Sequence, residues 1–221
     1  LPSVLKEIDD NDAPSLEEIM SQVPPGTAPP PKEMLVPGSL TFINHSAPAN
    51  ANSPVRWWTW SLNSNWRHPY GETSSINGLG DHPVVQTSWY DALAFSEWAG
   101  MSLPTEAQWE HTAQADYLGG AHFQQIYNLG STKDVGDFRP NSNGLYDMMG
   151  NVYEWTRDWY GPYPSEEVIS NPKGPSEGKE KVVRGGAWHS PSHYLRVADR
   201  VAKNPEYKYS DVGIRCSYSF K

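Results

Sequence analysis

The side chains whose chemistry is easiest to name lie close together late in the chain. His189, Ser192 and His193 fall within five consecutive positions. Imidazole nitrogens ligate copper, zinc or iron and act as general acids or bases, so these three are candidate catalytic residues. Pro191 lies between the histidines and prevents a regular helix that would align them. No third metal ligand is identifiable, and we expect surface or packed histidines here.

A dense group of tryptophans marks a second candidate region. Four of them lie between positions 57 and 66, namely Trp57, Trp58, Trp60 and Trp66. Rings of this size offer a stacking platform for a glycan or a peptide, or they fill the core of a fold that has little regular structure. Both interpretations remain open at this point.

The single cysteine, Cys216, carries no chemistry by itself. It cannot form an internal disulfide, and alone it cannot make a zinc site. We expect a small buried side chain, as is usual for a free cysteine.

Two helices and several short strands must position these residues. Ser88 with Asp91 predicts a helix that continues to position 99 and stops at Gly100, and Thr105 with Gln108 forms a capping box that opens a second helix. Short strands are expected over 83–87, 152–155, 182–184, 195–200 and 213–218, and the run 177–181 is expected to be a solvated hairpin tip. The predicted class is α+β, rich in loops.

Composition excludes several classes of protein. The 221 residues carry a net charge of −9, with 10 Trp, 12 Tyr, 18 Gly and 20 Pro. So many rings argue against disorder, and so many helix breakers argue against a coiled coil. No apolar run reaches the roughly 18 residues of a transmembrane segment. No cluster of basic residues suits a nucleic acid, so none is expected as a partner.

Four segments in order resemble the formylglycine-generating enzyme family, also called sulfatase-modifying factors. The first is Asn-Trp-Arg-His-Pro at 65–69, and the second runs from Asp-His-Pro-Val-Val at 81–85 through Leu-Pro-Thr-Glu-Ala-Gln-Trp-Glu at 103–110. The third is Gly-Leu-Tyr-Asp-Met-Met-Gly-Asn-Val-Tyr-Glu-Trp at 144–155. The fourth combines Val-Arg-Gly-Gly-Ala-Trp at 183–188 with Gly-Ile-Arg-Cys at 213–216. The resemblance implies a C-type-lectin-like fold with two main helices and short irregular strands. It extends over residues 34–221, whereas residues 1–33 read as a proline-rich arm or connector and the family's first strands are absent.

The resemblance also implies which chemistry is missing. Sulfatase-activating members of the family bind copper(I) through two cysteines just after a Gly-Gly-Ser turn and oxidise a substrate cysteine. Here Gly185 and Gly186 are followed by Ala187, and Cys216 matches a position outside that pair. Copper and formylglycine-generating activity are therefore not expected.

Calcium is the one cofactor that the resemblance favours. Family members bind one calcium ion around the motif represented here by Asp147, Gly150, Val152 and Glu154. Two carboxylates and two backbone carbonyls suit this hard cation. The alternative is a solvated turn with two ordinary acids; we expect a structural calcium.

The preferred function is a non-catalytic binding or structural accessory module, including a subunit of a larger assembly. Two alternatives stay open: a cysteine-independent oxidase or maturation enzyme of the family, and a maturation factor that only binds a sulfatase-type substrate peptide. A protein partner or a multi-subunit assembly is expected, with a peptide or glycan as a further possible ligand. No signal peptide opens the numbered chain, but a mature secreted protein begins in the same way, and we expect an extracytoplasmic location.

Overall fold

The computed structural model describes residues 38–42, 58–114, 121–123, 131–163, 165 and 169–218. The expected arm at 1–33 and Trp57 lie outside these ranges. Within them the elements are β1 (Gly38–Phe42), β2 (Trp58–Leu62), α2 (Trp89–Trp98), α3 (Glu106–Ala113), β3 (Tyr153–Trp159), β4 (Lys181–Arg184), the 3₁₀ helix η4 (Ser192–Leu195), β5 (Val201–Lys203) and β6 (Val212–Gly213).

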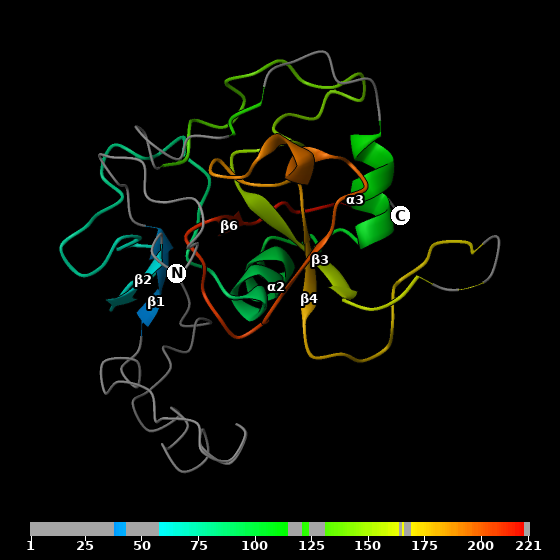
Figure 1. Cartoon of the computed structure of the whole chain (residues 1–221), viewed down its shortest axis with the longest axis horizontal. Helices are drawn as coiled ribbons and strands as arrows, with labels where there is room; N and C mark the ends of the chain where they lie inside the picture. Colours follow the sequence, from blue (N-terminus) through cyan, green and yellow to red (C-terminus); the bar gives the residue numbers. More distant parts are fainter. Residues whose placement is uncertain are drawn as a thin grey trace, which may run out of the picture.

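The larger sheet has the strand order β5-β4-β3-β6. β3 and β4 are antiparallel, as are β4 and β5, whereas β6 runs parallel to β3. β1 and β2 form a separate antiparallel ribbon on the side of the molecule opposite α3 (Figure 1). A bridge between Leu40 and Tyr209 and a 3.2 Å hydrogen bond from the Phe42 amide to Ser210 Oγ attach this ribbon to the body.

Both predicted helices are confirmed, together with their caps. The Ser88 hydroxyl accepts a hydrogen bond from the Asp91 amide at 3.1 Å, and the Asp91 carboxylate accepts one from the Ser88 amide at 2.8 Å. Thr105 and Gln108 make the same reciprocal pair at the start of α3. These side chains satisfy amides that have no partner within the helix, which explains why the chain turns helical at these two points.

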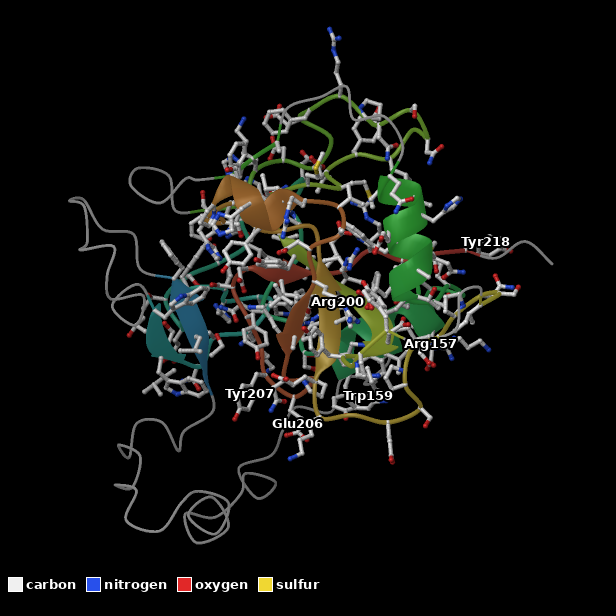
Figure 2. All side chains as sticks on the ribbon, turned by 45° about the vertical axis from the view of Figure 1, so that its right-hand side comes forward. Arg157, Trp159, Arg200, Glu206, Tyr207 and Tyr218 are labelled. Atoms are coloured by element: carbon white, nitrogen blue, oxygen red, sulfur yellow. The ribbon has the colours of Figure 1, made fainter. Side chains whose placement is uncertain are left out.

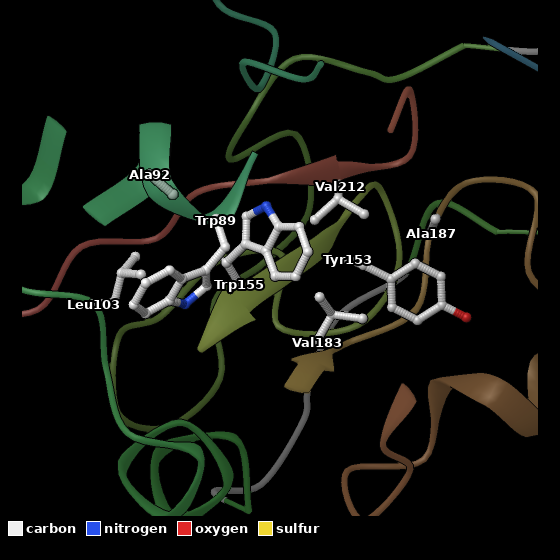
Figure 3. Packing of buried hydrophobic residues seen from close by; sticks show 8 residues of the cluster. All are labelled: Trp89, Ala92, Leu103, Tyr153, Trp155, Val183, Ala187 and Val212. Carbon is white, nitrogen blue, oxygen red and sulfur yellow. The ribbon is translucent and has the colours of Figure 1, made fainter. Parts of the chain in front are cut away.

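Tryptophans form the centre of the core. Trp89 and Trp155 are buried in one cluster with Ala92 of α2, Val183 of β4 and Val212 of β6 (Figure 3). The Trp89 indole N–H donates to the Thr156 carbonyl at 2.8 Å, and that of Trp155 donates to the Thr87 carbonyl at 3.2 Å. Each buried ring therefore keeps a partner for its polar edge.

The strand predictions were partly wrong. The segment at 182–184 is confirmed as part of β4, and the one at 152–155 as part of β3 except for Val152. The segment at 83–87 is a loop in which Gln86 has a φ of 60°. Residues 195–200 hold the end of η4 and a turn, and β5 begins only at Val201. Of the predicted strand at 213–218, only Gly213 pairs with β3, and Ser217 instead bridges to Ser102 near α2.

Lys181 corrects the expectation of a solvated tip at 177–181. Its side chain is buried, with Nζ lying 3.8 Å and 3.6 Å from the ring centroids of Trp89 and Trp159. Nζ also donates a 3.0 Å hydrogen bond to the Arg157 carbonyl. Two aromatic faces and a carbonyl compensate the ammonium for the loss of water.

An ion-pair network holds α3 against the sheet. Arg184 is fully buried and contacts Glu106 at 2.8 Å and Glu110 at 2.5 Å. Arg200 binds Glu106 at 2.6 Å. Such a network fixes the position of α3, since the fully buried Arg184 depends on the two carboxylates of that helix for its charge partners. In the described part of the chain, no helix is both long and apolar enough to cross a bilayer.

Candidate functional site

The four residues expected to hold calcium share one cavity of about 410 Å³. Asp147, Gly150 and Val152 precede β3, and Glu154 is the second residue of that strand. The other side of the cavity comes from the loop at 135–136 and from the segment after β6. Besides the four, its lining residues are Pro83, Val135, Gly136, Tyr146, Asn151, Ile214 and Arg215.

The turn that carries Asp147 and Gly150 has an unusual backbone. Asp147, Gly150 and Asn151 all have positive φ angles, of 55°, 88° and 63°. A Cβ added to Gly150 would lie 2.4 Å from the His122 carbonyl oxygen, so only glycine fits there. Asn151 holds the facing loop, because its side chain bonds the amide and the carbonyl of Lys133 at 3.0 and 3.1 Å.

Glu154 is buried at the inner end of the cavity and is already well supplied with donors. The indole N–H of Trp109 donates to Glu154 Oε2 at 2.7 Å. Arg215 binds both carboxylate oxygens, through Nε at 2.7 Å and Nη2 at 2.6 Å. Burial alone would lower the pKa of Arg215, but the facing Glu154 outweighs it and the pKa is raised. Sequence reasoning did not assign Arg215 to this site, because 61 positions separate it from Glu154.

Asp147 differs from Glu154 in its electrostatic setting. Its Oδ2 accepts a hydrogen bond from the Gly136 amide at 2.7 Å. Burial raises the pKa of Asp147, and the Gly136 hydrogen bond and Arg215 oppose that rise without cancelling it. A half-buried carboxylate of this kind gains from a bound cation.

The donor set is compatible with calcium, although it is not rich in charge. Among the described residues, no three His, Cys, Asp or Glu side chains come together as a metal cluster. An ion would therefore bind Asp147 and the carbonyls of Gly150 and Val152, and it would share Glu154 with Arg215. Calcium accepts such mixed oxygen ligands.

The candidate catalytic residues have dissimilar surroundings. His189 Nε2 lies 3.1 Å from Asp211 Oδ2, and the His189 ring stacks on Phe42 with centroids 5.3 Å apart. Ser192 and His193 are exposed on η4. His189 is thus packed and hydrogen-bonded to Asp211, and His193 is a surface residue.

A buried polar cluster around Asp211 was not anticipated. Asp211 is 1% exposed and accepts hydrogen bonds from Lys203 Nζ at 3.1 and 3.2 Å in addition to its contact with His189. Burial would raise the pKa of Asp211, but Lys203 and His189 outweigh burial and hold it below its ordinary range. Burial raises the pKa of the adjoining Tyr153 to about 12, and Ser190 Oγ donates to its hydroxyl at 3.3 Å. The cluster ties the segment after Gly186 to β5 and β6.

The described tryptophans of the group at 57–66 do not form one cluster. Trp58 meets Phe42 and His189 edge-on, with centroid distances of 5.5 and 5.4 Å. Trp66 lines a second cavity, and the Arg67 guanidinium lies 4.0 Å from its ring centroid. The lone Cys216 lies elsewhere, half-buried against α2, with Sγ 3.4 Å from Ser96 Oγ.

Two capped helices, a short curled sheet and long loops define this protein as an α+β domain of the C-type-lectin-like class. Among solved structures, the Treponema denticola variable protein 1 shares this fold with a TM-score of 0.56 and 20% identity, over 80% of this chain and 92% of that one. Residues 32–219 match the model of the sulfatase-modifying factor enzyme 1-like domain, and the chain belongs to that family.

Its curated relatives include formylglycine-generating enzymes. The mouse enzyme is 38% identical over 188 residues, which cover 73% of this chain and 50% of the enzyme. The Streptomyces coelicolor enzyme is 35% identical over 189 residues, which cover 73% of this chain and 60% of the enzyme. The chain thus spans about half the length of the mouse relative and somewhat more of the bacterial one.

Proposed function

We propose that this chain is a binding module of the sulfatase-modifying factor family and that it does not oxidise cysteine through thiol-bound copper. The supporting observation is the position of its one cysteine. Cys216 Sγ lies beside Ser96 of α2, and the segment after the Gly185–Gly186 turn has no thiol. Copper(I) is held by soft ligands, above all thiolates, and one thiol cannot supply a pair.

The histidines do not replace that pair. His189 contacts the buried carboxylate of Asp211 and three aromatic rings, those of Phe42, Trp58 and Trp188. A ring held in this way stabilises the fold rather than meeting a substrate. What remains for function is the set of cavities and exposed aromatic surfaces, which suits recognition of another polypeptide.

The decisive experiment is an oxidation assay. The purified chain is incubated in air with a copper(I) salt and a cysteine-containing peptide of the sulfatase type, and the peptide mass is followed. We expect no conversion of cysteine to the aldehyde, for the wild type and for Cys216→Ser alike. Conversion that Cys216→Ser abolishes would overturn the proposal. Conversion that only His189→Gln abolishes would favour the cysteine-independent enzyme.

We further propose that calcium binds at Asp147 and Glu154 in a structural role. Calcium at about 100 times its dissociation constant would stabilise the fold by roughly 2.7 kcal/mol. The melting temperature should therefore rise with calcium chloride and fall with a chelator, and Asp147→Asn should abolish the difference. Glu206→Gln is the matched control, because Glu206 is exposed and projects from a distant loop (Figure 2). A calcium response that persists in Asp147→Asn would contradict this assignment.

The calcium affinity expected for this cavity indicates where in or outside the cell the protein would act. Among the described side chains, two carboxylates line this cavity, and one of them already binds Arg215. Sites with little negative charge bind calcium weakly, in the millimolar range typical of extracellular modules. An affinity in this range would suit an extracytoplasmic site of action.

A further inference from the structure

A second cavity of about 170 Å³ adjoins the first, and the two share Pro83. Its lining is mainly apolar, with His82, Thr132 and the polar edges of Tyr70 and Trp66 as its polar groups. The lining residues are Trp66, Pro69, Tyr70, Ile76, Leu79, Gly80, His82, Pro83, Val84, Val85 and Thr132. The volume suits one aliphatic side chain, since pockets for drug-sized molecules measure about 300–1,000 Å³.

Hydrogen bonds hold the wall of this cavity in place. Asn65 Oδ1 accepts from the amides of Arg67 and His68 at 2.8 and 3.1 Å. Ser74 Oγ donates to the Gly71 carbonyl at 2.7 Å, and His68 Nδ1 lies 2.6 Å from the Ser74 carbonyl. A wall fixed by its own contacts loses little entropy when it binds a ligand.

Several apolar side chains that line this cavity are exposed to solvent. Val84 is 51% exposed, and Tyr70 and Ile76 are each 43% exposed. Single exposed apolar residues are ordinary, but several around one hollow mark an interaction site. His82 Nδ1 and Thr132 Oγ1 already bind each other at 2.7 Å, so these two side chains offer little to a polar ligand.

Acidic groups stand beside this hollow. The Asp81 carbonyl accepts the Val135 amide at 2.8 Å, which places the exposed Asp81 next to Asp134. The Asp134 side chain is 63% exposed and lies 3.2 Å from His82 Nε2. The nearby base Lys133 is paired with Asp137. The net charge at this edge is therefore negative.

We propose that this cavity docks a polypeptide partner, taking one aliphatic side chain into the hollow and a neighbouring lysine or arginine beside Asp81 and Asp134. This inference rests on the proposed function as a binding module. The apolar lining selects the aliphatic group, and the acidic edge selects the basic one. Pairing of charges at an exposed edge speeds association and sets specificity more than it adds affinity.

A fluorescein-labelled peptide, Gly-Ser-Lys-Leu-Lys-Ser-Gly, provides the test, with binding followed by fluorescence anisotropy. Replacing its leucine with alanine should weaken binding about tenfold, in line with the loss of buried apolar surface. Replacing both lysines with glutamate should weaken it at least as much at low salt. Equal binding of the three peptides would refute the proposal.

Variants of the protein locate the binding. Val84→Ser should weaken binding about fivefold at any salt concentration, and Asp134→Asn about threefold at low salt only. Both side chains are more than half exposed, so neither change should unfold the chain. Tyr207→Ser and Glu206→Gln, which change side chains that project from the loop after β5 (Figure 2), are the matched controls. If the controls weaken binding as much as the test variants, the cavity is not the site.

The peptide assay and the oxidation assay can fail separately. Absence of peptide binding with an unmodified cysteine substrate would reject this cavity and leave the proposed loss of oxidase chemistry intact. Peptide binding together with aldehyde formation would support this cavity as the docking site and reject the proposed loss of oxidase chemistry.

Discussion

Glu154 and Arg215 form a two-point ion pair, with nitrogen–oxygen distances of 2.6 and 2.7 Å, that joins β3 to the segment after β6. Glu154 is 5% exposed, so Arg215 and Trp109 supply the hydrogen bonds that water would otherwise give its carboxylate. The pair closes one end of the larger cavity and links two parts of the chain that are distant in sequence.

Arg215→Ala should lower the free energy of unfolding by about 3 kcal/mol, because a buried carboxylate would lose its cation. Urea denaturation measures the change. Arg157→Ala is the matched control, since Arg157 is exposed on the same strand as Glu154, and we expect less than about 0.5 kcal/mol there. Similar losses in both variants would show that the pair is not a stabilising contact.

Gly150→Ala should destabilise the protein far more than Gly78→Ala. Both glycines have positive φ angles, of 88° and 81°, so both changes carry the backbone cost of about 1–2 kcal/mol. Only at Gly150 does the new Cβ meet a backbone atom, the His122 carbonyl oxygen at 2.4 Å, whereas Gly78 has nothing within 4 Å. We expect a difference of about 2 kcal/mol in urea, from overpacking alone. Equal effects would mean that the turn can relax.

Lys181 should make stability depend on pH in the alkaline range. Burial lowers the pKa of Lys181 from 10.5 to about 8, so the folded protein releases this proton before the unfolded chain does. Stability from this group therefore rises with pH from about 8 toward 10, by at most about 1.4 kcal/mol per pH unit. The difference in unfolding free energy between the wild type and Lys181→Met, measured in urea at pH 8 and 9.5, should grow accordingly. A constant difference would show that the buried amine does not titrate.

Asp211 should make stability depend on pH in the acidic range. Lys203 and His189 outweigh burial and hold the pKa of Asp211 below its ordinary value, so the unfolded chain takes up this proton first as the pH falls. Stability from Asp211 is complete above pH 4 and is lost at lower pH. At pH 7, Asp211→Asn should cost about 3 kcal/mol. Asp199→Asn should cost less than about 1 kcal/mol, because its partner Arg196 is 73% exposed.

The wild-type advantage over Asp211→Asn should shrink between pH 4 and pH 2. Circular dichroism during acid titration follows this loss. If the advantage stays constant down to pH 2, the carboxylate does not depend on its two cationic neighbours.

Local signals in the sequence predicted the helices well, because a capping box is complete within four residues. Ser88 with Asp91 and Thr105 with Gln108 needed no knowledge of the rest of the fold. The short strands were harder to predict. Residues 83–87 have a strand-like composition, yet the Gln86 amide bonds the Tyr209 carbonyl outside any ladder, and its backbone takes a positive φ.

Part of the candidate site could be predicted because its residues lie close together in the sequence. Asp147, Gly150, Val152 and Glu154 lie within eight positions and came from a single motif, and they do line one cavity. Their long-range partners could not be read from spacing. Arg215 reaches Glu154 across 61 positions, and Asp211 reaches His189 across 22. Lys181 looked solvated because the two rings that cover it come from α2 and β3.

The parallel pairing of β6 with β3 has a consequence for the order in which the molecule assembles. Translation makes β3 before β6, so the nascent chain exposes Glu154 and one edge of β3 until residues 212–215 arrive. Contacts of such high sequence separation form late and slow the folding reaction. The larger cavity, which Ile214 and Arg215 help to line, is therefore among the last parts to form. An intermediate that lacks it would expose an unpaired strand edge open to aggregation.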